Sequence, residues 1–474
     1  MIRSLCLTLV YLAFIVLGVT TPFVLTLGYA WVDTFRPQAV AYIILNQIPV
    51  AMIMGIAAIA TYFFMDRRSP PRLTLATVLS ITMGIWVTLT LIWAEAPESA
   101  WAKWDWAFKT VMFSAFVPLV IRSRVQIEAF AQTYVLSLAA NFIPFGIKTM
   151  ISGGGYGRNL GLMEGNSNLS EGGLLSTICL MAIPLAWHLA RHTQLVPRTR
   201  PITLGYIGLC GLALVTAIGT FERSAVIGLV VLGAYMFSRA RNKFAFGLLA
   251  GVVILGIIYT TSAGWNQRIS SIGDSAQDSS AQTRLMVWSW TLNYAVTHPF
   301  GGGFMSYLVD RIEYDDGFVV FGRAFHSIYF EVLGEQGWVG LALFLGLAGS
   351  TFVGLRRLAR RTRNVPHLAW CADMSDALQS GLAVFLTAGA FVSIAYQPAF
   401  WYFIAMSISL REYVRRAQLP APATGWRARV ARPPAGGVAA PAPAPAKAPA
   451  PVPVRGGVAP SWRHRPVLGR TAPR

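Results

Sequence analysis

Long apolar segments alternate with short basic ones in this chain, as in GGLLSTICLMAIPLAWHLA (172–190), RHTQLVPRTR (191–200), ITLGYIGLCGLALVTAIG (202–219), SAVIGLVVLGAYMFS (224–238) and RARNK (239–243). A run of about 20 apolar residues is long enough to cross the hydrocarbon core of a bilayer as a helix. Because a backbone inside the bilayer must satisfy its own hydrogen bonds, helices are the structure expected for such runs. The stretch therefore predicts successive transmembrane helices joined by short loops.

The same pattern extends over most of the 474 residues. Apolar residues make up 55% of the chain and charged residues 12%, whereas soluble domains carry about 25% charged residues. We therefore expect an all-α, polytopic integral membrane protein with about twelve transmembrane helices. These helices are expected near 5–28, 38–64, 74–93, 104–121, 127–148, 172–190, 202–219, 224–238, 244–261, 328–354, 377–397 and 398–413.

The basic residues predict the orientation of these helices. Alternate loops, such as DRRSPPR (66–72) and RRLARRTR (356–363), are strongly basic, and the loops between them are acidic or mixed, such as AEAPESAWAK (94–103). Positive loops stay on the cytoplasmic side of a membrane. We therefore expect both termini of the chain in the cytoplasm.

The net charge of +19 does not indicate nucleic-acid binding, because nearly half of it comes from one segment. Residues 417–474 carry nine Lys or Arg and no acidic residue. We divide the chain into a transmembrane domain (1–413) and an Ala/Pro/Arg-rich cytoplasmic tail (414–474). Such a composition cannot bury a core, so the tail is expected to be disordered. It serves either as a linker or as a basic contact with anionic lipid.

A large loop (262–327) is expected on the outer side between the ninth and tenth helices. Within it, QTRLMVWSWTLNYAV (282–296) is amphipathic and rich in tryptophan, which predicts a helix lying at the outer membrane interface. The segment HPFGGGF (298–304) then ends this helix. A nucleotide-binding glycine loop lies between a strand and a helix. The glycines here do not lie in that context, so they do not indicate a nucleotide-binding loop.

The outer loop ends in FGRAFHSIYFEVLGEQGWVGLALFL (321–345), which places His326 at the mouth of a transmembrane helix. Polar groups at this depth are costly unless they face the helix bundle or water. A neutral imidazole there can accept a proton from an attacking hydroxyl. The alternative is an interfacial histidine that only caps the helix.

Three outward arginines suggest that the protein binds an anion. Arg223 lies in a very short connection beside Glu222, Arg284 lies in the outer loop, and Arg158 lies in GGGYGRNLG. A guanidinium is expensive at the membrane surface unless it meets a carboxylate, a phosphate or water, and its fork geometry suits phosphate oxygens. The alternatives are a pairing of Arg223 with Glu222 or with lipid headgroups, and ordinary loop charges for the other two.

Several chemistries have no support in the sequence. It contains no Walker A, GxSxG or HExxH motif, and its four cysteines form no CxxC or Cys/His cluster. The acidic residues of the outer loop follow no metal-binding spacing, so we expect solvated charge there and neither a metal nor a cofactor. These residues are Asp274, Asp278, Asp310, Glu313, Asp315 and Asp316.

The order of these elements resembles the O-antigen ligase/polymerase superfamily of bacterial membrane glycosyltransferases. The resemblance rests on Arg223 after a middle helix, on Arg284 followed by WSW and PFGGGF, and on HSIYFEVLGEQGWVGL. It covers about residues 1–413. LGYAWVDTFRPQ (27–38) and the tryptophan-rich 86–106 resemble a subgroup, the O-glycosylation ligases associated with exosortase systems.

The resemblance implies a reaction and a set of site residues. Members transfer a glycan from undecaprenyl diphosphate to a lipid, polysaccharide or protein hydroxyl at the periplasmic face of the inner membrane, without metal or nucleotide. His326, Arg223 and Arg284 match the functional positions of the family, and Arg158 matches less closely. We also expect Arg323 and Glu331 to contact the diphosphate or the acceptor.

Two departures leave the acceptor class open. Many members have Ser-Arg-Gly at the middle arginine and Asn after the histidine, whereas this chain has Glu222-Arg223-Ser224 and Ser327. A polysaccharide polymerase of the same superfamily remains an alternative. A flippase or transporter for lipid-linked glycan is a second alternative, although no internal repeat supports it. A structural subunit of an export complex is the third.

Overall fold

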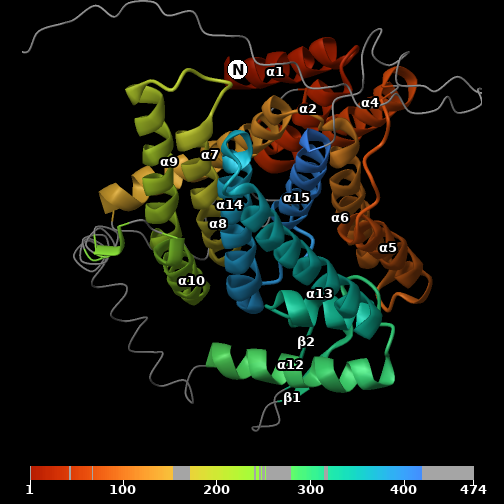
Figure 1. The fold of residues 1–474 in the computed structure, drawn as a ribbon. Coiled ribbons are helices and arrows are strands. Elements are labelled where there is room, and N and C mark those ends of the chain that lie inside the picture. The colour runs from red at the N-terminus through yellow and green to blue at the C-terminus, as the bar shows by residue number, and fades with distance from the viewer. Residues whose placement is uncertain are drawn as a thin grey trace, which may run out of the picture. The chain divides into compact units, whose positions relative to one another are not determined.

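The computed structural model describes residues 2–41, 44–66, 68–152, 171–239, 242–244, 247, 251, 279–313 and 319–418. The first half of the chain forms α1 (Ile2–Gly18), α2 (Pro22–Phe35), α3 (Pro37–Val40), α4 (Val50–Met65), α5 (Leu75–Leu89), α6 (Pro97–Val120), α7 (Arg124–Ser152) and α8 (Gly172–His192). The second half forms α9 (Arg200–Gly219), α10 (Arg223–Arg239), α12 (Ser279–Thr297), α13 (Ile328–Thr362), α14 (Ala369–Ala388) and α15 (Pro398–Ala417), shown in Figure 1.

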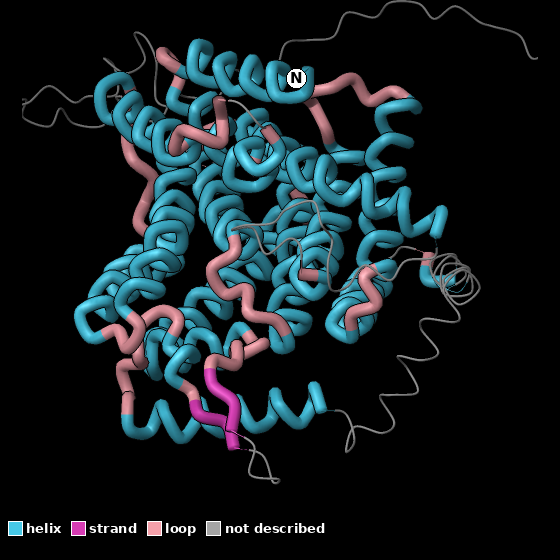
Figure 2. Tube along the Cα trace, turned by 180° about the vertical axis from the view of Figure 1, so that it is seen from behind, coloured by secondary structure: helices cyan, strands magenta, loops and turns pink. Residues whose placement is uncertain are grey.

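The remaining elements are short. Single 3-10 turns lie at η1 (Thr90–Trp93), η2 (Ser306–Val309), η3 (Pro366–Leu368) and η4 (Gly389–Phe391). Within the outer loop, β1 (Arg311–Glu313) pairs antiparallel with β2 (Val319–Phe321), with Arg311 opposite Phe321. This small hairpin, beside α12 in Figure 2, was not predicted from the sequence. The rest of the described chain fits the predicted all-α class.

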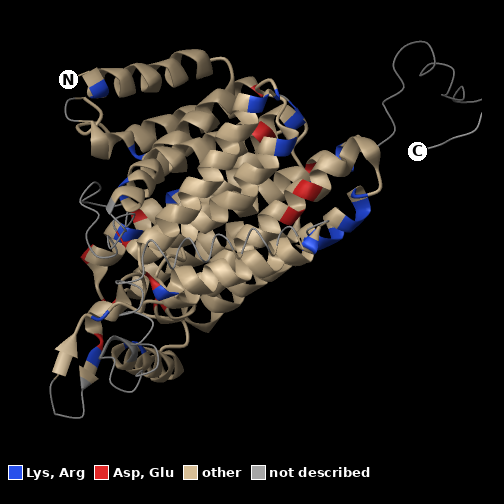
Figure 3. Cartoon of the chain, turned by 90° about the vertical axis from the view of Figure 1, so that its left-hand side faces the viewer, with Lys and Arg blue, Asp and Glu red and all other residues tan. Residues whose placement is uncertain are grey.

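Five of the described helices are long and apolar enough to cross a membrane. They comprise Leu75–Trp93, Arg124–Ile151, Gly172–His192, Arg200–Gly219 and Ile328–Thr362, and two shorter apolar helices are Ile2–Gly18 and Val50–Met65. Charged residues lie mainly near helix ends and connections, and long helical stretches carry none (Figure 3). These features support a multi-pass membrane protein. The number of twelve spans stays a prediction, and most of the expected helix 244–261 lies outside the described residues.

The first two predicted helices are wrong in their boundaries. The expected helix 5–28 is two helices, because α1 ends at Gly18 and α2 begins at Pro22. The expected helix 38–64 is divided into α3 and α4, and α4 begins directly after Pro49. Proline lacks a backbone N–H and disfavours helical geometry in the residue before it, so helices start at proline more readily than they pass through it.

The helix expected at 377–397 is also placed incorrectly. It begins earlier, at Ala369, and ends at Ala388, so that a non-helical segment (392–397) precedes α15. Pro398 occupies the first position of α15 and keeps Gln397 extended, with φ −66° and ψ 139°. This segment matters below because its backbone contacts the candidate site.

The core is built around α8 and α15, which are buried along nearly their whole length. α8 packs against α7, α9, α10 and α14, and α15 packs mainly against α6 and α14. Large aromatic side chains fill the space between α7 and α15, where Phe130 and Tyr134 meet Tyr402 edge to face at 5.3 and 6.0 Å between ring centres. Such edge-to-face contacts between aromatic rings are favourable.

The connections sort into two ends of the bundle. The basic loops meet at one end, where Arg122 Nη1 donates to the Ser69 carbonyl at 2.5 Å and Arg124 Nη2 to the His192 carbonyl at 2.8 Å. At the opposite end, α12 lies crosswise under the other helices, with the hairpin beside it (Figures 1 and 2). The predicted helix at 282–296 is therefore confirmed as α12, and the two ends are called here the basic end and the α12 end.

Candidate functional site

A break in α13 organises the α12 end. Gly337 has φ +66° and ψ −167° inside α13, which divides it into a short first segment (328–336) and a long second one. L-residues rarely adopt such a φ, and glycine does so without steric cost. Because of this break, the short segment, which carries Glu331 and Glu335, runs in a different direction from the long apolar segment.

The glycine-rich loop after α12 packs into this break. Gly302 N donates to the Gly334 carbonyl at 3.0 Å, and Trp338 N donates to the Pro299 carbonyl at 3.0 Å. A Cβ on Gly337 would lie 2.2 Å from the Pro299 carbonyl oxygen, closer than any real contact. A Cβ on Gly301 would lie 2.5 Å from Gly337 N, so glycines on both sides allow the two backbones to approach closely.

A buried ionic cluster fixes the short segment of α13. Lys103 Nζ, from α6, lies 2.7 Å from Glu331 Oε1 and 2.7 Å from Glu335 Oε1. The side chains of Lys103, Glu331 and Glu335 are 11%, 5% and 0% exposed. Glu331 Oε2 also accepts a hydrogen bond from Ala395 N at 2.9 Å. Because buried charges are costly unless they are paired, this cluster specifies how α6, α13 and the 392–397 segment fit together.

His326 lies directly before this segment in a strained conformation. Its φ is +49°, in the left-handed region, and Ser327 then stands at the N-cap position of α13 without a side-chain cap hydrogen bond. A non-glycine residue in this region costs of order 1–3 kcal/mol, and such strain is often found at functional sites. Burial, followed by the positive charges of Arg284 and Arg323, lowers the pKa of the His326 imidazole. These effects favour the neutral form of the His326 imidazole.

Arg284 links His326 to a carboxylate from another part of the chain. Its charge acts on His326 and also on Glu171, which directly precedes α8. Burial and the negative charges of Glu222 and Glu331 raise the pKa of Glu171 to about 7, and Arg284 opposes this shift. Arg284 Nε is buried and has no hydrogen-bond partner among the described residues. A buried donor of this kind is costly unless it binds something.

Aromatic contacts hold α12 and the loop before α13 together. Trp288 Nε1 donates to the Phe325 carbonyl at 2.8 Å, and the Trp288 ring stacks on Phe330 with 5.0 Å between ring centres. At the base of the hairpin, both carboxylate oxygens of Asp310 accept from Arg323 N at 3.1 Å. These contacts determine the position of the His326 backbone relative to Arg284.

The predicted site residues are distributed as follows. The charges of Arg284 and Arg323 both act on His326, and Glu331 lies in the buried cluster with Lys103 and Glu335. Arg223 is the first residue of α10, whose Ser224 lies against the start of α8. Arg158 lies outside the described residues. Whether these residues act on a substrate stays a prediction.

Metal binding has no support in the part of the chain that the structure describes, which holds no group of three or more potential ligands. Asp310 is buried and accepts hydrogen bonds from the Arg323 backbone, so its carboxylate has a structural role. Of the other acidic residues considered above, Asp274, Asp278, Asp315 and Asp316 lie outside the described residues.

Sequence reasoning missed Lys103 and Glu171. Lys103 stood in a loop that is mixed in charge, and Glu171 stood in a polar segment (149–171), so each looked like a solvated residue. No local signal pointed to the pairing of Lys103, because its two glutamate partners lie more than 200 residues away along the chain.

Two family models match the chain. A family of unknown function, DUF5935, matches residues 2–194, and the O-antigen ligase family, Wzy_C, matches residues 208–345. No curated protein matches the chain. The second match contains Arg223, Arg284, Arg323, His326 and Glu331, whereas the first contains Lys103 and Glu171. The match over 208–345 shows that this part of the chain is similar to O-antigen ligases, which suggests a membrane glycosyltransferase of the ligase or polymerase type.

Proposed function

We propose that this protein transfers a glycan from undecaprenyl diphosphate to an acceptor hydroxyl at the periplasmic face of the bacterial inner membrane. The observation that carries the proposal is the buried Nε of Arg284, which has no hydrogen-bond partner among the described residues, in an arginine whose charge acts on His326. A guanidinium beside a neutral base fits a reaction in which an anionic leaving group departs and a hydroxyl loses its proton.

In the proposed reaction, Arg284 binds the diphosphate of the donor, together with Arg223 at the start of α10. The acceptor oxygen attacks the anomeric carbon, and the bond between that carbon and the phosphate oxygen breaks. The electron pair leaves with undecaprenyl diphosphate. Guanidinium groups that are fixed before the reaction stabilise the charge that develops on this oxygen. Arg158 and Arg323 are further diphosphate contacts in this proposal.

His326 accepts the proton of the acceptor hydroxyl. Its lowered pKa keeps the imidazole neutral and able to accept at pH 7. Glu171, with a pKa of about 7, is a second group able to take up or release that proton. Diphosphate is already a good leaving group, so correct placement of the acceptor contributes more than a strong base.

Glu331 supports the site from behind. Both of its carboxylate oxygens are occupied by protein donors, one by Lys103 and one by Ala395 N. This arrangement favours a positioning role for Glu331 over a contact with substrate. The basic end and both termini face the cytoplasm in this proposal, and residues 414–474 form a tail. The subgroup associated with exosortase systems is the relative we favour.

A reconstituted transfer assay tests the proposal. The purified protein is supplied with undecaprenyl diphosphate-linked oligosaccharide and with lipid, glycan and peptide acceptors, in the presence of a metal chelator and without nucleotide. We expect glycan transfer by the wild type and a loss of about 10²–10³ in rate for Arg284→Ala. Arg284→Lys should remain strongly impaired, because an ammonium cannot form the guanidinium fork. His326→Ala should also lose activity.

Arg311→Gln is the matched control, since Arg311 is an exposed arginine of the same loop. Its activity should remain at the wild-type level. If the wild type transfers nothing but moves the intact donor across a vesicle membrane, the proposal is overturned in favour of a transporter. If glycan transfer survives in both Arg284→Ala and His326→Ala, the proposed site is wrong.

A further inference from the structure

Gln336, the last residue before the break in α13, is bound by two residues from the first half of the chain. A break in a helix leaves the carbonyls before it in need of other donors. The backbone carbonyl of Gln336 accepts a hydrogen bond from Trp86 Nε1, in α5, at 2.9 Å. Its side-chain Oε1 accepts one from Thr90 Oγ1, in η1, at 2.9 Å. Because Gln336 is fully buried, these protein donors take the place that water would have at an exposed helix end.

The same part of the chain also binds the glycine-rich loop that packs into the break. Trp93 Nε1 donates to the Gly301 carbonyl at 3.0 Å. The backbone N–H of Glu95 donates to the Gly302 carbonyl at 2.9 Å. The end of α5, η1 and the residues that follow therefore hold both the loop and the short segment of α13.

These contacts connect the regions that match the two families. Their donors lie within residues 86–103, inside the match to the family of unknown function, and their acceptors lie within 301–336, inside the match to the O-antigen ligase family. The donors are Trp86, Thr90, Trp93, Glu95 and Lys103, of which the last forms the buried ion pairs with Glu331 and Glu335. One short stretch of the first region thus binds the break of the second at several points.

The short segment of α13 in turn holds the residues on both sides of His326. Glu331 N donates to the Ser327 carbonyl at 2.8 Å. The ring of Phe325 packs against Gly334, where an added Cβ would lie only 2.5 Å from Phe325 Cζ. Since His326 lies between Phe325 and Ser327, its strained backbone depends on the position of the short segment.

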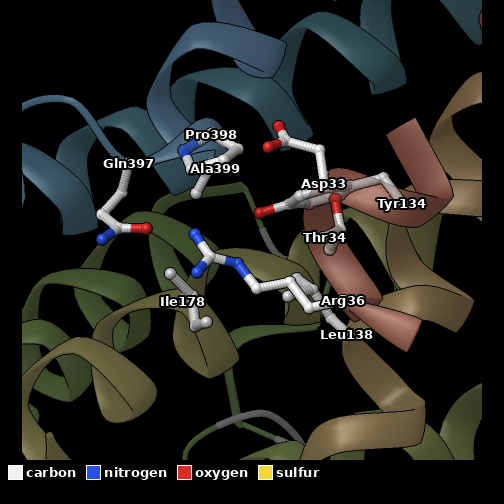
Figure 4. A pocket seen from close by; sticks show the side chains of 9 residues that line it. All are labelled: Asp33, Thr34, Arg36, Tyr134, Leu138, Ile178, Gln397, Pro398 and Ala399. Carbon is white, nitrogen blue, oxygen red and sulfur yellow. The ribbon is translucent and has the colours of Figure 1, made fainter. Parts of the chain in front are cut away.

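The first region has a second contact with the support of this segment. The backbone N–H of Ala395, in the segment 392–397, binds the buried ionic cluster. At the end of the same segment, Gln397 lines a small cavity together with Arg36 and Tyr134, which belong to the first region (Figure 4). Arg36 has a left-handed backbone, with φ +56°, between α2 and α3. Both supports of the short segment are therefore in contact with the first region.

We propose that the region matched by the family of unknown function holds the short segment of α13 in place and thereby positions His326, with Trp86 and Thr90 as positioning residues. Four hydrogen bonds and the shared ion pairs of Lys103 join the two regions at the break. The importance of His326 for glycan transfer rests on the proposed function, whereas its positioning is a property of the fold and is measured without substrate.

The test follows the reaction of His326 with diethyl pyrocarbonate in the full-length purified protein, without donor or acceptor. Peptide mass spectrometry over a range of pH gives the rate and the pH midpoint of this reaction for each histidine. Trp86→Phe and Thr90→Val each remove one hydrogen bond to Gln336. Because burial lowers the pKa of His326, a loosened segment should raise the midpoint toward its ordinary value and increase the rate about 2–10-fold.

Trp104→Phe is the matched control. Trp104 Nε1 donates to Thr88 Oγ1 at 3.0 Å, so this variant loses an indole hydrogen bond that stays within the first region, and His326 should react as in the wild type. The exposed His367, at the basic end, is the internal reference and should react equally in every variant. A general loss of stability would not move the midpoint of His326, because the midpoint depends on its surroundings in the folded protein.

A response of His326 in one variant alone assigns the positioning role to that residue. An unchanged rate and midpoint in both Trp86→Phe and Thr90→Val, or an equal change in Trp104→Phe, overturns the inference. If His326 responds as expected and the wild type transfers no glycan, the positioning stands and the proposed function fails.

Discussion

The two ends of the bundle use charge in different ways. At the basic end, Asp376 is bridged to Arg239 and Arg363, and these two arginine side chains are 36% and 47% exposed. At the α12 end, Lys103 is 11% exposed and is shared by two glutamates that are more deeply buried still. Exposed ion pairs contribute about 0–1 kcal/mol, whereas breaking a buried one costs several.

We interpret the charges of the basic end as determinants of membrane orientation and those of the α12 end as parts of the candidate site. Positive charges gathered at one end of a helix bundle are expected to set its orientation in the membrane, which depends on their number more than on the exact place of each. At the α12 end, Lys103, Glu331 and Glu335 are buried and fixed by one another, close in sequence to the backbone break at Gly337. Buried arginine donors without a hydrogen-bond partner occur at both ends among the described residues, namely Arg284 Nε at the α12 end and Arg122 Nε and Nη2 at the basic end.

The largest effect expected from this comparison concerns Lys103. Lys103→Met should reduce the free energy of unfolding by about 3–5 kcal/mol, because it leaves Glu331 and Glu335 buried beside each other without a cation. The measurement is an SDS titration of the purified protein followed by tryptophan fluorescence. Arg363→Gln at the basic end should cost no more than about 0.5 kcal/mol.

Lys109→Met is the matched control on the same helix. Lys109 pairs with Asp105 four residues earlier, and the two side chains are 36% and 55% exposed, so its loss should cost at most about 0.5 kcal/mol. If Lys103→Met and Lys109→Met prove equally stable, the buried cluster does not stabilise the α12 end.

A smaller effect is expected at the break in α13. Gly337→Ala should destabilise the protein by about 2 kcal/mol or more, since alanine is strained at φ +66° and its Cβ would collide with the Pro299 carbonyl. Gly349→Ala lies later in the same helix with no atom near its added Cβ, and it should be neutral or stabilising by up to about 1 kcal/mol. The same SDS titration compares them, and equal unfolding midpoints would contradict the interlocked break.

The smallest effect is a change in pH dependence. Arg323 lowers the pKa of His326, so Arg323→Gln should raise that pKa toward its ordinary value. The imidazole then becomes protonated at a higher pH, and the acidic limb of the kcat/KM profile should move upward in pH. The profile is recorded between about pH 5 and 8, the range in which histidine titrates. If the Arg323→Gln profile is identical to that of the wild type, His326 does not take part in the rate-limiting proton transfer. The control Arg311→Gln should leave the profile unchanged.

Much of the architecture follows from local sequence patterns. Apolar runs predicted the helices from 74–93 to 224–238, and the amphipathic 282–296 predicted α12, because each pattern reports on a single element and its solvent. The predicted helix boundaries were wrong near Pro22, Pro49 and Pro398, where a single proline interrupts an apolar run without changing the mean hydropathy of that run. Hydropathy averages over a window, so it does not register a break of this kind.

The sequence by itself indicated a multi-pass membrane protein with a long polar loop, and it pointed to Arg284 and His326 as candidates, because these are properties of composition and residue type. Only the tertiary structure decided which distant groups meet. Lys103 pairs with glutamates more than 200 residues away. The charge of Arg284 affects the pKa of Glu171, and Arg36 lines a cavity together with Tyr134. These contacts arise from helix packing and from backbone breaks at Gly337 and Arg36, and neither the charge nor the hydropathy of a single segment encodes them.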